Sequence, residues 1–406
     1  MDKMADVLGR AGAWCGQNKY LSAIKNAFQN FMPLTIAGAI GVLWCNVLVN
    51  ESTGLGIFFK PIMALDFLNP AFQAVNFCTI SCITVGITLG IAQEIGVWNM
   101  GAEKAGYIPG LVGLAAWLSV TNTSHMVEGA KEAFTGIAGN ELGATGLFTG
   151  MIIGVLSVEL FCFFEKQDAL KIKMPEQVPP GVARAFEVLV PATITLIITA
   201  CIGSACYNLT GLYLNDVIKN GIQGPLGAVG ATIPGVMIIY LVIMLFWLVG
   251  IHGNNMLSAV KEALFTPLAL ENVEAFNKGE TPKNIINMYF LQMCGEFGGS
   301  GVTIGLVIAI MIFGKREDNK AIATLSLVPG LFNINETVTF GIPMVLNPIL
   351  GIPFVFACLV TILVGYVLTV IGFCPVACLT VPWTTPPIVF GFLATGANIM
   401  GAVTQA

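Results

Sequence analysis

The sequence predicts an all-α integral membrane protein with about ten transmembrane helices and two re-entrant hairpins. The first observation is composition: 56% of the 406 residues are hydrophobic and only 10% are charged, whereas soluble domains contain about 25% charged residues. The second is a series of long uncharged stretches, and the third is a set of polar, glycine-rich breaks in the C-terminal half. Strand-like alternation is absent, which argues against a transmembrane β-barrel.

Eight uncharged stretches mark the candidate crossings. Most are close to the roughly 20 residues that a helix needs to cross hydrocarbon, and the last is long enough for several crossings. The stretches are residues 26–50, 67–93, 105–127, 142–158, 188–215, 220–260, 297–314 and 337–406.

Basic residues predict the orientation, because lysine and arginine concentrate in cytoplasmic connections. They cluster before the first stretch and after the fourth, so we expect a cytoplasmic N-terminus. The polar start of the chain contains no cleaved signal peptide, and the first apolar run should remain as an anchor. The two clusters are Lys3, Arg10, Lys19 and Lys25, and Lys166, Lys171, Lys173 and Arg184.

Residues 159–187 are the most polar connection and contain Pro175, Pro179 and Pro180, which block helix continuation. We place the division between two domains here, at 1–175 and 176–406. The second domain continues through a basic connection at 261–283, predicted to be a cytoplasmic loop. Residues 295–301 then read Gly-Glu-Phe-Gly-Gly-Ser-Gly, too broken for one spanning helix. Irregular backbone at membrane depth must line a cavity or be buried in protein, so we expect re-entrant hairpins.

Glu336 is the only carboxylate side chain after Asp318, and it precedes a tail without a charged side chain. An ionisable side chain in such a segment is costly and by default functional. Asn333 and Asn335 precede it, and an acid beside amides offers the donors and acceptors that bind sugar hydroxyls. The motif therefore predicts a site for a neutral polyol.

His252 lies at the end of a very apolar run, between Gly250 and Gly253 and before Asn254. Glycine permits close approach of a backbone or ligand, and a neutral imidazole both donates and accepts. The alternative is a histidine that ties two helices together; the second polar motif at Glu336 favours the site. We interpret His125, beside Asn122 at the end of a span, as interfacial and structural.

Tryptophan is the largest platform on which a sugar ring can stack, and Trp383 and Trp247 are candidates. The alternative for both is anchoring at the membrane interface. Trp383 fits stacking better, because its flanking prolines and threonines indicate an unwound segment. Glu296 and the glycines at 298–301 are compatible with an anion path, although glycine clusters more often serve close helix packing.

Several functions are excluded. No glycine-rich phosphate loop with Lys and Ser/Thr is present, so the chain has no ATPase of its own. The 11 cysteines lie singly in apolar runs without histidine or aspartate neighbours, which predicts buried thiols and no metal. A net charge of −5, thinly spread, indicates no nucleic-acid partner. No cofactor is expected.

Taken together, the motifs resemble the enzyme IIC permeases of the lactose, cellobiose and diacetylchitobiose branch of the bacterial phosphotransferase system. The resemblance covers essentially the whole chain and rests on five motifs in the same order. One departure is Thr337, where the family usually has proline after the glutamate, which makes the fine substrate preference less certain. The motifs are residues 250–255, 298–303, 332–336, 347–354 and 381–387, with less specific matches at 18–21, 32–33, 146–148 and 178–182.

The resemblance implies a fold like that of the glucose superfamily of these permeases and a homodimer in the cytoplasmic membrane. It assigns the dimer interface to the first half, and sugar binding between re-entrant hairpins to the second, which moves like an elevator. It also implies that His252 and Glu336 contact the sugar. Phosphate would come from phosphoenolpyruvate through a separate, cysteine-phosphorylated IIB protein, so no phosphorylated residue is expected in this chain.

The physical logic agrees. A neutral disaccharide offers no charge for a membrane potential to act on, whereas phosphorylation adds about two negative charges and prevents its return. Glu336 and His252 are the candidate catalytic residues, either positioning the sugar 6-hydroxyl or accepting its proton, and we favour positioning. The sequence leaves cellobiose, diacetylchitobiose and lactose open, together with the resting conformation. An ion-coupled symporter is the alternative. It would need a buried carboxylate pair, for which Glu336 and Glu296 are the candidates, or a sodium site built from carbonyl oxygens.

Overall fold

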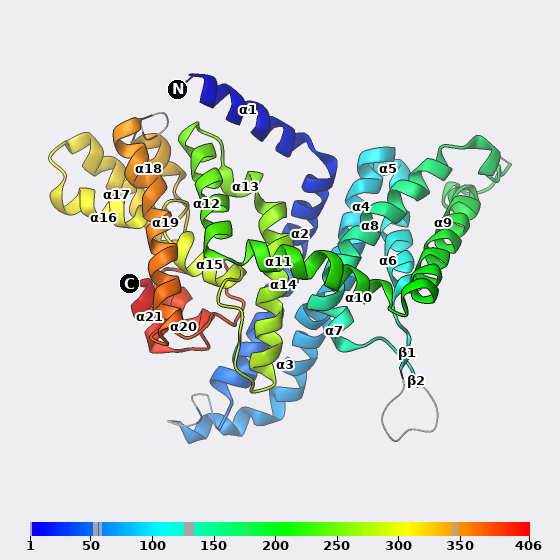
Figure 1. Ribbon diagram of the computed structural model, residues 1–406, viewed down its shortest axis with the longest axis horizontal. Helices are drawn as coiled ribbons and strands as arrows, with labels where there is room; N and C mark the ends of the chain where they lie inside the picture. Colours follow the sequence, from blue (N-terminus) through cyan, green and yellow to red (C-terminus); the bar gives the residue numbers. More distant parts are fainter. Residues whose placement is uncertain are drawn as a thin grey trace. The chain divides into compact units, whose positions relative to one another are not determined.

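The computed structural model is mostly helical (Figure 1) and describes residues 2–51, 56, 59–125, 134–175, 177–342, 344 and 347–406. The chain forms two compact units. Unit 1 contains Met1–Gln17, Leu34–Cys78 and Gly227–Ala406, and unit 2 contains Asn18–Pro33 and Thr79–Leu226. The boundaries differ from a single cut at 175/176 because the chain passes four times between the units, after Gln17, Pro33, Cys78 and Leu226.

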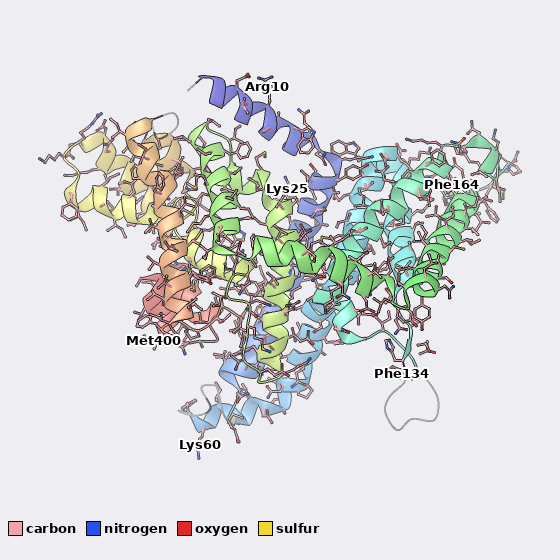
Figure 2. All side chains as sticks on the ribbon, viewed as in Figure 1. Arg10, Lys25, Lys60, Phe134, Phe164 and Met400 are labelled. Carbon is pink, nitrogen blue, oxygen red and sulfur yellow. The ribbon has the colours of Figure 1, made fainter. Side chains whose placement is uncertain are left out.

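Four helices in the described part of the chain are long and apolar enough to cross a membrane: Lys19–Leu48, Ala144–Glu165, Pro180–Thr210 and Ile349–Val370. A fifth crossing results if Lys60–Ser81 and Ile83–Met100 count as one bent span. Shorter apolar helices cover Ile108–Val120, Ile233–Leu248 and Thr303–Phe313. The predicted stretch 220–260 is therefore divided, since its apolar helix ends at Leu248. Many large apolar side chains stay exposed on the isolated chain, Leu156 of Ala144–Glu165 and Ile197 of Pro180–Thr210 among them, as expected of a surface that faces lipid. Figure 2 draws the side chains on the ribbon.

Unit 2 is a bundle in which α4, α6 and α8 pack against one another, and α9 packs on α6 and α8. Small residues make the close contacts: a Cβ on Gly154 of α8 would lie 3.2 Å from the carbonyl oxygen of Thr88 on α4. Helices in membranes commonly associate through such residues. Unit 2 contains α4 (Ile83–Met100), α5 (Ala102–Ala105), α6 (Ile108–Val120), β1 (Ser124–His125), β2 (Phe134–Thr135), α7 (Gly139–Leu142), α8 (Ala144–Glu165), α9 (Pro180–Thr210) and α10 (Leu214–Ile218). The helices α2 (Lys19–Leu43) and α11 (Gly224–Gly230) begin in unit 2 and end in unit 1.

One small strand pair departs from the all-helical prediction. β1 and β2 pair antiparallel, with Ser124 opposite Thr135 and His125 opposite Phe134. The imidazole of His125 lies 5.6 Å from the Phe134 ring and its Nε2 lies 3.2 Å from the carbonyl oxygen of Asn122. These contacts are local to the hairpin.

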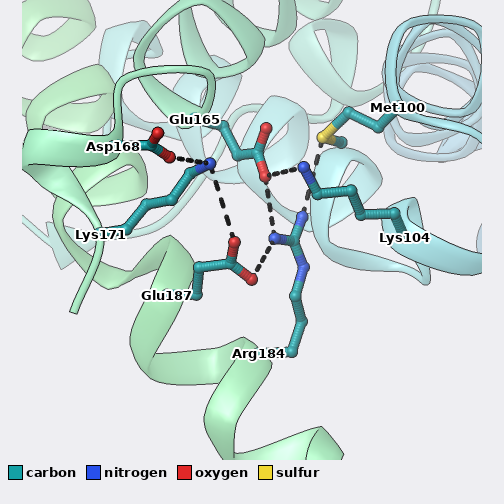
Figure 3. A network of polar contacts seen from close by, with 7 residues as sticks. All are labelled: Met100, Lys104, Glu165, Asp168, Lys171, Arg184 and Glu187. Atoms are coloured by element: carbon teal, nitrogen blue, oxygen red, sulfur yellow. Dashed lines mark hydrogen bonds and ion pairs between the residues drawn. The ribbon is translucent and has the colours of Figure 1, made fainter. Parts of the chain in front are cut away.

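A network of ion pairs ties the polar connection after α8 to the neighbouring helices of unit 2 (Figure 3). The buried carboxylate of Glu165 lies 2.8 Å from Lys104 and 2.9 Å from Arg184. Arg184 also pairs with Glu187 at 2.8 Å, and Lys171 lies 3.9 Å from Glu187. Several predicted cytoplasmic cations therefore have anionic partners within the unit. Lys171 also donates to Asp168 and lowers the pKa of that carboxyl.

Unit 1 contains the polar motifs of the C-terminal half. α12 packs on α19, α15 on α14 and α19, α16 on α17, and α20 on α21. Asparagine side chains cap three helices in the described part of unit 1. Asn287 accepts from the N–H groups of Tyr289 and Phe290 in α15, Asn347 does the same for Ile349 and Leu350 in α19, and Asn398 accepts from Met400 in α21. The helices are α1 (Asp2–Gln17), α3 (Asn69–Asn76), α12 (Ile233–Leu248), α13 (Gly253–Met256), α14 (Ser258–Asn277), α15 (Met288–Gly295), α16 (Thr303–Phe313), α17 (Glu317–Leu331), α18 (Glu336–Gly341), α19 (Pro348–Val370), α20 (Val389–Ala394) and α21 (Ile399–Gln405).

The backbone of unit 1 is broken where the sequence predicts it. α15 ends at Gly295 and α16 begins at Thr303, and α13, α15, α18 and α20 are all far shorter than the roughly 20 residues needed to span a bilayer. One prediction is wrong: residues 261–283 are not a loop, because α14 continues to Asn277. The ends of these short helices carry the polar residues of the candidate site.

Candidate functional site

The structure brings His252 and Glu336 together within unit 1. The Nε2 atom of His252 lies 3.6 Å from Oε1 of Glu336, and the side chains are 36% and 47% exposed. His252 is the N-cap residue of α13, and Glu336 is the first residue of α18. Two segments far apart in the chain therefore present a carboxylate and an imidazole to the same accessible place.

The contacts of His252 fix the direction of its ring. The backbone N–H of Asn255 donates to Nδ1 at 3.3 Å, so in the neutral ring the hydrogen is on Nε2. That hydrogen is on the side of the ring that faces Glu336. The neutral imidazole consequently offers a donor, and Glu336 offers acceptors. Such a pair is suited to a hydroxyl group, which both donates and accepts.

The residues around His252 explain its setting. The ring of Trp247 lies 4.4 Å from the imidazole centroid, and the indole is 1% exposed. Trp247 therefore supports His252 from behind and does not present an open stacking face here. A Cβ on Gly253 would strike the carbonyl of Ile243 in α12, so only glycine lets the turn after His252 approach that helix.

Asn333 connects three segments of unit 1. Its Oδ1 accepts from the backbone N–H of Gly298 at 2.6 Å, and its Nδ2 donates to the carbonyl oxygens of Trp383 and Thr385. The residue has a φ of 62°, a conformation that asparagine tolerates better than most residues. Its predicted role was sugar binding; in this structure the amide bonds to protein backbone.

Asn335 and Asn254 meet at Ser300. Asn335 is 3% exposed and donates to the carbonyl oxygen of Ser300 at 2.6 Å, while Nδ2 of Asn254 donates to the Ser300 hydroxyl at 2.8 Å. The glycine next to Ser300 is required, since a Cβ on Gly299 would lie 2.5 Å from the Cβ of Asn335. Both amides are thus engaged within the protein.

Trp383 is the accessible aromatic residue among the predicted site residues. Its side chain is 43% exposed, and it lies between α19 and α20 in a segment without regular helix. The N–H of Thr385 donates to the carbonyl of Pro382 at 2.9 Å and closes a turn around it. Through Asn333, this turn is connected to the segment that carries Glu336.

Two residues of this region escaped the sequence prediction, Lys261 and Tyr240, and both contact Glu296, which the sequence indicates only as a candidate for an anion path or a carboxylate pair. Lys261 is 6% exposed and forms an ion pair with Glu296. The hydroxyl of buried Tyr240 donates to the same carboxylate at 2.7 Å. The sequence does not indicate that Lys261 is buried, because Glu262 follows it and two adjacent charged residues are typical of the start of a solvated connection.

The comparisons with known proteins establish the family. The model of the family described as "Phosphotransferase system, EIIC" matches residues 25–358. The chain belongs to this family. It is 34% identical to the oligo-beta-mannoside-specific EIIC component of Bacillus subtilis, over 100% of this chain and 89% of that protein. It is 29% identical to the cellobiose-specific EIIC component of Lactococcus lactis, over 97% and 91%.

A solved structure supports the same assignment. The structure of this chain superposes on the crystal structure of ChbC, the IIC component of the N,N'-diacetylchitobiose-specific phosphotransferase system, with a TM-score of 0.88 and 30% identity, covering 97% of this EIIC chain and 90% of ChbC. The predicted family is confirmed. The chain is a multi-pass sugar permease component of the cytoplasmic membrane, of the cellobiose, chitobiose and lactose group.

Proposed function

We propose that this EIIC chain carries a β-linked disaccharide across the cytoplasmic membrane and delivers it to a separate phospho-IIB protein for phosphorylation. The observation that supports this most directly is the approach of His252 to Glu336, 3.6 Å apart and partly exposed. An acceptor and a donor at this spacing are matched to one sugar hydroxyl. Trp383 supplies an accessible ring face on a segment connected to the same motif.

The chemistry follows from these groups. Glu336 accepts a hydrogen bond from the sugar 6-hydroxyl and holds it in line for the phosphoryl group, and Nε2–H of His252 donates to the hydroxyl oxygen. Phosphoryl transfer passes through a loose transition state, so positioning contributes more than removal of the proton. The product gains about two negative charges and is retained in the cytoplasm.

The substrate class is proposed from the relatives. Oligo-β-mannoside, cellobiose and diacetylchitobiose appear in the names of the EIIC proteins that this chain resembles. We propose a disaccharide of the cellobiose, diacetylchitobiose or lactose type. The shared hydroxyl contacts do not separate these sugars, and pocket shape must decide between them.

We further propose a homodimer with about ten transmembrane helices and two re-entrant hairpins per chain, in the manner of the glucose superfamily. Residues 1–175 would form the dimer interface, and residues 176–406 would move the sugar like an elevator. The N-terminus would be cytoplasmic. The short helices α15, α18 and α20 and the broken backbone at 296–302 support the hairpins. The basic residues before α2 and after α8 support the orientation.

The ion-coupled symporter receives less support. Its carboxylate pair would need Glu296 beside Glu336, but Glu296 has a cationic partner in Lys261 and a donor in Tyr240. Its charge is compensated without an added ion.

Uptake into vesicles tests the proposal. Purified protein is reconstituted with phosphoenolpyruvate, the general carrier proteins and IIB enclosed, and uptake of cellobiose, diacetylchitobiose and lactose is followed. We expect accumulation of the sugar phosphate only when IIB and phosphoenolpyruvate are present. Accumulation of unmodified sugar driven by a sodium or proton gradient would refute the proposal. Glu336→Gln should abolish most of the phosphorylation; wild-type binding and phosphorylation in this variant would remove Glu336 from the mechanism.

A further inference from the structure

The segment that supports both site residues is strained. Gly298, Gly299 and Gly301 have φ values of 69°, 90° and 82°, and Val302 has a φ of 56°. Positive φ is readily adopted by glycine, but for a β-branched residue it is an outlier. Such a conformation persists only when the surrounding contacts hold it. The geometry of the site therefore depends on the contacts that hold this segment in place.

Ser300, at the centre of the segment, is bonded from two sides. Its hydroxyl accepts from Asn254, two residues after His252, at 2.8 Å. Its carbonyl oxygen accepts from Asn335, the residue before Glu336, at 2.6 Å. A single buried serine consequently connects the segment of the imidazole with the segment of the carboxylate, and a displacement of Ser300 would change the distance between them.

Lys261 determines which end of the Asn254 amide faces Ser300. Its Nζ lies 3.5 Å from Oδ1 of Asn254, so the oxygen is directed to the ammonium and the NH2 group to the serine. Lys261 is itself held by the ion pair with Glu296, and Tyr240 orients Glu296 from α12 at 2.7 Å. The chain of contacts runs from α12 and α14 through Asn254 to Ser300.

We propose that Lys261 is a positioning residue: by orienting Asn254 toward Ser300, it holds the strained segment 298–302 and sets the separation of His252 and Glu336. Its effect on sugar affinity rests on the function proposed above. Its effect on the segment 298–302 is independent of that function and is present in the sugar-free protein.

The test uses a double variant, Lys261→Met with Glu296→Gln. Lys261→Met alone leaves a carboxylate without its partner, which destabilises proteins for reasons unrelated to positioning. The double variant removes both charges and keeps an acceptor for Tyr240. Lys278→Met with Glu274→Gln is the matched control. It removes another lysine–glutamate pair from the region of α14, but that pair is exposed, and exposed pairs contribute little.

Hydrogen exchange in the sugar-free protein is the first measurement. We expect peptides covering 297–303 and 332–337 to exchange faster in the K261M/E296Q variant, with the thermal midpoint and the remaining peptides close to wild type. The control should match wild type throughout. Unchanged exchange in these two segments would refute the positioning role, and faster exchange across all of unit 1 would show that the pair serves general stability instead.

Binding of cellobiose, diacetylchitobiose and lactose is the second measurement. For the sugar that binds wild type most tightly, we expect Kd to rise about tenfold in K261M/E296Q, the effect of one misplaced hydrogen-bonding group, and to stay unchanged in the control. An unchanged Kd in K261M/E296Q would refute the link between Lys261 and the site. If wild type bound none of the three sugars, the proposed substrate class would fail, and the exchange experiment would still decide the role of Lys261.

Discussion

The side-chain oxygen of Asn333 lies 2.6 Å from the backbone nitrogen of Gly298, while the nitrogen of the same amide donates to the carbonyl oxygens of Trp383 and Thr385. One side chain thus connects the glycine-rich segment, the turn around the accessible tryptophan and the segment that carries Glu336. The backbone of Asn333 has a φ of 62°, which asparagine tolerates better than most residues. This position therefore requires both the backbone conformation and the side-chain amide of asparagine. Asn333 therefore holds these three segments together through hydrogen bonds to their backbone.

Asn333→Ala should reduce stability and sugar affinity together. It removes three hydrogen bonds and places alanine at positive φ, so the free energy of unfolding should fall by about 2–4 kcal/mol. Thermal unfolding in detergent and binding of the best of the three disaccharides measure the two effects. Asn140→Ala, an exposed position in α7 of unit 2, is the control. Lost sugar affinity with a wild-type melting temperature would instead indicate that Asn333 contacts the sugar.

The two predicted tryptophans should behave differently because one is buried and one is accessible. Trp247 is 1% exposed and lies against His252, so Trp247→Ala should destabilise the protein by about 3–5 kcal/mol. Trp383 is 43% exposed, so Trp383→Ala should weaken sugar binding about three- to tenfold, with little change in the melting temperature. Melting curves and binding isotherms of both variants test this. The reverse pattern would contradict the assignment of the stacking face.

Much of the site follows from local sequence. A lone carboxylate in an uncharged tail and an imidazole between glycines stand out because ionisable groups are rare at membrane depth, and the structure brings Glu336 and His252 together. The glycines between residues 295 and 302 likewise predict the interruption of the helix that the structure has there.

Other features depend on partners distant in the sequence. From the sequence alone, Asn333 is predicted to bind the sugar. In the structure its amide nitrogen donates instead to the carbonyl oxygens of Trp383 and Thr385, which are 50 and 52 residues away. From the sequence alone, Lys261 is predicted to be solvated. In the structure it forms an ion pair with Glu296, which is 35 residues away. The neighbours of Trp383 favour an accessible ring, and its side chain is 43% exposed, whereas the apolar run around Trp247 permits either role and the fold buries it to 1% exposure. The local residues indicate polarity, and the fold decides which polar groups remain free.

Gly253→Ala should destabilise unit 1 because the added methyl group would collide with the carbonyl of Ile243. Overpacking of this kind costs about 1–3 kcal/mol, and relief by displacement of α13 would move His252 and weaken sugar binding. Gly305→Ala is the matched control, since it is in α16 with no heavy atom within 4 Å of the added Cβ, where alanine favours the helix by up to about 1 kcal/mol. Thermal unfolding of the pair measures the difference. Equal melting temperatures would show that the turn after His252 tolerates a side chain.

The tautomer of His252 provides the most direct test of how the site treats a hydroxyl. The N–H of Asn255 donates to Nδ1, so neutral His252 should carry its hydrogen on Nε2 and act as a donor beside Glu336. The chain has only two histidines, so His125→Gln leaves a single imidazole for nitrogen NMR of the purified protein. We expect the Nδ1 signal of an unprotonated nitrogen and the Nε2 signal of a protonated one at neutral pH, with a shift of Nε2 when the sugar binds. A ring protonated on Nδ1 instead would present a lone pair to the hydroxyl, and His252 would then be the acceptor and the better candidate for a base than Glu336.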